Sequence, residues 1–123
     1  RVIRLLQSVA GERRTMFIAA ADLSHVGPAF GQDELMPKDS EDRRRVKTED
    51  EVLLKAIVSG SRRRFFEAIR NNNDRNRICG FSPIYMTMWA ADTTIGTWIG
   101  YQQCQADEED TSFVSIAGAA LFG

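Results

Sequence analysis

The sequence predicts an α/β fold with a mixed sheet flanked by helices, and three observations carry this prediction. An apolar run at residues 16–21 leads into a polar loop, which is typical of a buried strand. Apolar residues then recur at helical spacing over three stretches in the middle of the chain. Two β-rich runs, 97–106 and 112–121, close the sequence on either side of an acidic turn. The expected order is helix, strand, three helices and two strands.

Length and composition limit the chain to one core. It has 123 residues, of which 43% are hydrophobic and 27% charged. We expect residues 1–123 to form a single domain or the C-terminal fragment of a larger one, because the chain starts at Arg1 and helical spacing begins at once, without a capping residue. A net charge of −1 argues against nucleic-acid binding. No apolar run reaches the roughly 18 residues of a membrane span, so we expect no membrane contact and a cytoplasmic location.

The N-terminal half contains the least regular patterns. Helical spacing starts at Val2 and ends at Gly11. Residues 32–47 carry a proline and a charged run without an apolar period, which predicts a long surface excursion. Thr48 is followed by three acidic residues, a pattern that predicts a capping box and a helix over residues 49–59.

The C-terminal half has clearer signals. Two further helices are expected at 61–71 and 82–93, the second with Pro83 in its first turn, where the missing N–H does no harm. The run 112–121 is small and apolar, so we place it inside the sheet, with 97–106 nearer an edge.

The loop after residues 16–21 contains Asp22, Ser24 and His25, the only histidine of the chain. In open α/β sheets the ligand crevice lies beyond the carboxyl ends of the strands, where this loop would be. Asp22 would orient the His25 ring or share a proton with it, as in general bases and metal-bound imidazoles. The alternatives are a purely structural imidazole and a local turn closed by Asp22 or Ser24.

Two cysteines, Cys79 and Cys104, are too few for a disulfide framework. Cys79 lies just before a predicted helix N-terminus and close to Arg77, and both features favour a thiolate that acts as a nucleophile or soft-metal ligand. An inert buried cysteine is the alternative. We expect Cys104, which lies in a β-rich run, to fill the core.

Four segments together resemble a known family. They are FIAAADLSHVGPAFG at 17–31, RICGFSPIYM at 77–86, TWIGYQQCQ at 97–105 and SFVSIAGAAL at 112–121. The most specific parts are the Asp-x-x-His-x-Gly loop and the Cys-Gly before a helix, in this order. The chain resembles the C-terminal half of the Memo-like proteins, which include the bacterial and archaeal members grouped as AmmeMemoRadiSam system protein B.

This resemblance implies an α/β domain related to the class III extradiol dioxygenases, which use non-haem iron. It implies that Cys79 is a metal ligand or reactive thiol, and that Asp22 and His25 line the same pocket as acid/base or substrate-orienting groups. The implied cofactor is iron or copper. The implied activity is metal-dependent redox or dioxygenase-like chemistry on an unknown small-molecule substrate.

One departure from the family pattern bears on activity. Memo-like proteins supply two further histidines from an N-terminal half, whereas this chain has His25 alone. One thiolate and one imidazole are too few for a catalytic metal site, so we expect no tightly bound metal here. The expected partners are the missing N-terminal half and, for the fragment, a second copy in a homodimer that covers the exposed surface. The alternative function is a non-catalytic binding or scaffold module that keeps the fold.

Overall fold

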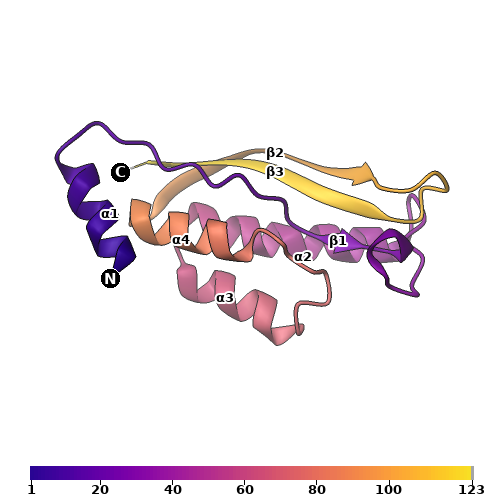
Figure 1. The fold of residues 1–123 in the computed structure, drawn as a ribbon. Helices are drawn as coiled ribbons and strands as arrows, with labels where there is room; N and C mark the ends of the chain where they lie inside the picture. Colours follow the sequence, from indigo (N-terminus) through magenta and orange to yellow (C-terminus); the bar gives the residue numbers. More distant parts are fainter. Residues whose placement is uncertain (123) are drawn as a thin grey trace.

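The computed structural model describes residues 1–122, and Figure 1 shows four helices and a three-stranded sheet. The elements are α1 (Val2–Gly11), β1 (His25–Val26), the 3-10 turn η1 (Pro28–Phe30), α2 (Glu41–Val58), α3 (Arg62–Asn71), α4 (Phe81–Ala91), β2 (Ile95–Gln105) and β3 (Phe113–Phe122). The predicted α/β class is confirmed. Within the described residues, no helix is both long and apolar enough to cross a membrane.

The sheet has the order β1-β3-β2, and both strand pairs are antiparallel. The prediction of a mixed sheet is therefore wrong for the described residues, because the short connection between β2 and β3 makes a hairpin and β1 runs opposite to β3. The placement of β3 inside the sheet and β2 at its edge is confirmed. In Figure 1 the two long strands form one layer, α2 and α4 lie against it, and α3 lies beyond them.

The predicted strand at residues 16–21 does not form. This segment is extended but unpaired, with Met16 82% and Ile18 78% exposed. Pairing begins only where the N–H of Leu23 donates to the carbonyl of Ser115 over 2.9 Å. The physical reason is a cleft of about 730 Å³, lined by residues of 15–21 on one side and of β3 on the other. Figure 1 shows the segment running along β3.

The predicted surface excursion at 32–47 is wrong in its second half. Helix α2 begins at Glu41, with the Ser40 hydroxyl accepting the N–H of Arg43 over 3.2 Å. Thr48, predicted to be a cap, lies inside the helix and donates to the carbonyl of Arg44 over 3.0 Å. Except for the buried Arg43, the charged residues of this run lie towards solvent on the first turns of α2.

The remaining helices confirm the predictions from apolar spacing, with ends shifted by one or two residues. The main core lies between α2, α3, α4 and the sheet, and its buried members include Leu54, Phe65 and Met88. A smaller cluster at the other end of α2 is made of Val26, Met36, Val46 and Phe113.

A buried arginine holds the hairpin tip against α2. Arg43 donates to the carbonyl of Met36 over 2.6 Å and to the carboxylate of Asp110 over 2.5 Å. Its guanidinium also lies 4.9 Å from the centre of the Phe113 ring. The acidic turn after β2 is thereby fixed to the start of the long helix.

Candidate metal centre

Three side chains that the sequence singles out come together at one point of the surface. Asp22, His25 and Cys79 each offer one ligand atom, and these atoms all lie within 4.8 Å of one another. Asp22 and His25 come from the segment that enters β1, whereas Cys79 precedes α4. The predicted grouping of the three residues is therefore present in the structure.

The orientation of the His25 ring is set by two contacts. Its Nδ1 lies 3.2 Å from the carbonyl oxygen of Leu23, and its ring packs edge-on against Phe30 at 5.1 Å between centroids. A carbonyl accepts only, so this contact is a hydrogen bond in the form whose Nδ1 carries the proton. Nε2 lies 3.9 Å from Oδ2 of Asp22. The His25 side chain is 19% exposed and that of Asp22 49%, so the group is open to solvent.

The backbone around His25 is tied to two other parts of the fold. The N–H of Ser24 donates to the hydroxyl of Ser115 over 2.9 Å, and the N–H of Ser115 donates to the carbonyl of Ser24 over 2.9 Å. The N–H of His25 donates to the carbonyl of Asn76 over 2.8 Å. The imidazole thus stands between β3 and the loop that leads to Cys79.

Cys79 is exposed and immediately precedes Gly80, the N-cap residue of α4. Its Sγ lies 4.0 Å from the carbonyl oxygen of Asp22. The N–H of Gly80 donates to that same oxygen over 3.1 Å, so the two segments that carry the ligand atoms are joined directly. Cys104 lies in β2, partly buried, and is not part of the group.

Sequence reasoning missed Asp50, which lies beneath His25 in the interior. It is fully buried and accepts hydrogen bonds from the hydroxyls of Ser24 over 2.6 Å, Ser115 over 2.6 Å and Tyr101 over 2.9 Å. The predicted capping box places Asp50 among the acidic residues of a helical first turn. A usable signal was present, because Asp50 shares the helical spacing of the buried residues Val46, Leu53, Leu54 and Ile57.

Burial raises the pKa of Asp50, although the three hydroxyl donors act in the opposite direction. The pKa of Tyr101 is raised as well, by burial first and then by the neighbouring Asp50 carboxylate. Tyr101 therefore remains a hydroxyl donor to Asp50 over the physiological pH range.

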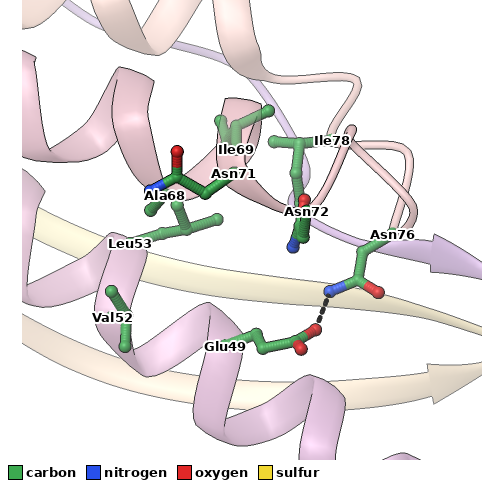
Figure 2. A pocket seen from close by; sticks show the side chains of 9 residues that line it. All are labelled: Glu49, Val52, Leu53, Ala68, Ile69, Asn71, Asn72, Asn76 and Ile78. Atoms are coloured by element: carbon green, nitrogen blue, oxygen red, sulfur yellow. Dashed lines mark hydrogen bonds between the residues drawn. The ribbon is translucent and has the colours of Figure 1, made fainter.

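Asn76 connects the site to a second cavity of about 250 Å³, shown in Figure 2. The side chain of Asn76 donates to Glu49 of α2 over 2.6 Å, and its backbone carbonyl holds His25. Burial opposes the charged form of Glu49, but hydrogen bonds from Arg75 and Asn76 outweigh this and lower its pKa. The loop before Cys79 is therefore anchored to α2 at physiological pH.

The donor set fits a transition metal. A carboxylate oxygen, an imidazole nitrogen and a cysteine sulfur are the ligand types used for copper, iron and zinc in proteins. Two of the three side chains, those of Asp22 and Cys79, are well exposed. Further coordination positions would face solvent, as in an open site.

Comparison with known proteins assigns the chain to a family. A search of curated proteins finds no significant match. The family model described as "Memo-like protein" matches residues 1–120, which is nearly the whole chain. This match covers both the Asp-x-x-His-x-Gly loop and the Cys-Gly before α4. The chain therefore belongs to the Memo-like protein family.

Proposed function

We propose that this chain provides one side of an iron or copper centre, with Cys79 as a metal ligand and His25 and Asp22 beside it. The observation that carries the proposal is the convergence of three different donor atoms within 4.8 Å, from segments more than 50 residues apart. A local turn closed by the Ser24 hydroxyl does not account for it, because this hydroxyl donates to Asp50 instead.

The residues divide the work by chemistry. Cys79 supplies a soft sulfur donor, and Nε2 of His25 supplies a borderline nitrogen donor. Asp22 is placed to act as a third donor or to exchange a proton with His25 through Oδ2, 3.9 Å from Nε2. When bound, iron or copper would supply one-electron redox chemistry at this position.

The chemistry we propose for the complete protein is metal-dependent oxidation, of the dioxygenase-like kind, acting on a small-molecule substrate. We also propose that the complete protein is related in its chemistry to the extradiol dioxygenases and to AmmeMemoRadiSam system protein B. Three donors, two of them on exposed side chains, would hold the metal weakly, so an N-terminal half bearing further ligands would be the partner that completes the centre.

A second candidate is a binding or scaffold module without catalysis. The apolar cleft of about 730 Å³ beside β3 favours it, since none of the residues that line this cleft is charged. Metal binding separates the two candidates, because a scaffold module has no use for the paired thiol and imidazole.

The test is a titration of the reduced protein with Co²⁺, whose bond to a thiolate gives a charge-transfer absorption. We expect weak binding with this absorption in the parent protein and in Cys104→Ser, and loss of the absorption in Cys79→Ser. We also expect copper or iron to be retained below one equivalent per chain after dialysis. An unchanged absorption in Cys79→Ser, or one tightly held metal per chain in that variant, would overturn the proposal.

A further inference from the structure

A buried carboxylate with three hydroxyl donors calls for an explanation. Asp50 is fully buried on α2, with no basic side chain among its hydrogen-bond partners in residues 1–122. Burying a carboxylate without a countercharge is costly even when it is hydrogen-bonded. An aliphatic residue at this point of the α2 apolar face would serve packing better, so the carboxylate has some other use.

The geometry shows what the carboxylate holds. Its Oδ1 accepts the hydroxyl of Ser24, the residue before His25. Its Oδ2 accepts the hydroxyl of Ser115, whose oxygen in turn accepts the N–H of Ser24. Ser24 is thus fixed through both its side chain and its backbone, and both connections lead to Asp50.

The fixed Ser24 determines the position of the ring beside it. The carbonyl of Leu23 and the ring of His25 lie on either side of Ser24 and meet through the contact from Nδ1 over 3.2 Å. A change in the backbone torsions of Ser24 moves this acceptor relative to the ring. When the two separate, the proton on Nδ1 loses its partner, and the ring is no longer held with Nε2 towards Asp22.

From these contacts we infer that Asp50 is a positioning residue, which sets the orientation and tautomer of His25 through Ser24. The inference deepens the proposed function, on which its metal readout rests. Partners beyond a metal-bound histidine commonly set metal affinity in this way, with effects of 10- to 100-fold.

Tyr101 provides a matched control within the same network. Like Ser24, it donates one hydroxyl to the buried carboxylate, but it does so from β2 and touches Gln103 rather than His25. Tyr101→Phe and Ser24→Ala each remove one hydrogen bond to Asp50. A purely structural role of Asp50 would make the two substitutions equivalent at the site.

The experiment compares Ser24→Ala, Asp50→Asn and Tyr101→Phe for Co²⁺ affinity and for the His25 tautomer, measured by ¹⁵N NMR in metal-free protein. We expect Ser24→Ala and Asp50→Asn each to weaken Co²⁺ binding about 10-fold, and the double variant to be no weaker than either. In both, the Nε2-protonated tautomer should grow. Tyr101→Phe should leave the affinity and the tautomer unchanged.

Two results would overturn the inference. One is an effect of Tyr101→Phe equal to that of Ser24→Ala, and the other is full additivity of Ser24→Ala and Asp50→Asn. If the parent protein binds no Co²⁺, the proposed function fails, but the tautomer comparison still decides the role of Asp50. An unchanged tautomer in Ser24→Ala would then count against it.

Discussion

The backbone nitrogen of Gly80 and the carbonyl oxygen of Asp22 are 3.1 Å apart, and this hydrogen bond joins the two segments that carry the ligand atoms next to the ligands themselves. A Cβ at position 80 would lie 2.3 Å from that oxygen and 2.8 Å from the Cβ of Ala21. Only glycine therefore allows helix α4 to approach the loop before β1 this closely.

Gly80→Ala is expected to push the start of α4 away from Asp22. Overpacking of this kind costs about 1–3 kcal/mol in the free energy of unfolding, and Cys79 should leave the group, with loss of the Co²⁺ thiolate absorption. The matched control is Gly100→Ala on β2, where an added Cβ meets nothing within 4 Å. Urea denaturation and Co²⁺ titration of both variants check this. Equal behaviour of the two variants would contradict it.

The two cysteines should differ in reactivity. Cys79 is exposed at the beginning of α4, whereas Cys104 is partly buried within β2. We expect Cys79 to be alkylated faster by iodoacetamide at neutral pH. Pulse labelling followed by peptide mapping measures both rates in one sample. Equal or reversed rates would remove the chemical argument for Cys79.

The free energy of unfolding should depend on pH through the titration of Asp50. Burial raises the pKa of Asp50 above its value in the unfolded chain. Between these two values the folded state binds more protons, so the free energy of unfolding contributed by Asp50 falls as pH rises through this window. Asp50→Asn does not titrate, and Glu49 titrates in both proteins. The free energy of unfolding of Asp50→Asn, relative to that of the parent protein, should therefore increase as pH rises. Urea denaturation of both proteins between about pH 3 and 7 measures this difference. A constant difference would contradict this.

Self-association is expected through the cleft beside β3. Ala117, Ala119 and Leu121 have the same parity as Ser115, so their backbone groups face away from β2, and none bonds residues 15–21 in the described structure. Such an edge pairs readily with another chain. We predict a homodimer in light scattering over a dilution series, and a monomer for Ala119→Asp, which places a charge in the cleft. Ile99→Asp on β2 should not change the dimer. A parent protein that stays monomeric at high micromolar concentration would contradict the prediction.

The sequence predicted those elements that their own apolar periodicity is enough to identify. Helix α3, helix α4 and the β2–β3 hairpin form where the periodicity places them. The strand expected at 16–21 did not form because a cleft separates this segment from β3, and hydrogen bonds to β3 begin only at Leu23.

The start of α2 could not be settled from its local signals. Ser40 and Thr48 are both followed by acidic residues, so each resembles a cap. The burial of Arg43 and Val46 in the folded protein favours Ser40.

The candidate ligands could be predicted from the sequence, whereas the role of Asp50 could not. Asp22, His25 and Cys79 stand in recognisable motifs, and the structure brings them together. The role of Asp50 depends on hydroxyls that lie 26, 51 and 65 residues away. No local pattern contains that information, and only its place on an apolar face pointed inward.

Helix α2 meets the hairpin at both of its ends. Arg43 donates to Asp110 at the turn, and at the other end Gly96 of β2 packs so closely on α2 that a Cβ there would lie 2.9 Å from the carbonyl oxygen of Val58. Eighteen residues of helix make a rigid rod of about 27 Å, at 1.5 Å per residue. The length of α2 therefore sets the register in which β2 and β3 pair. A slip of the strands by two residues, which would keep every side chain on its own face, is barred because it would draw Asp110 away from Arg43.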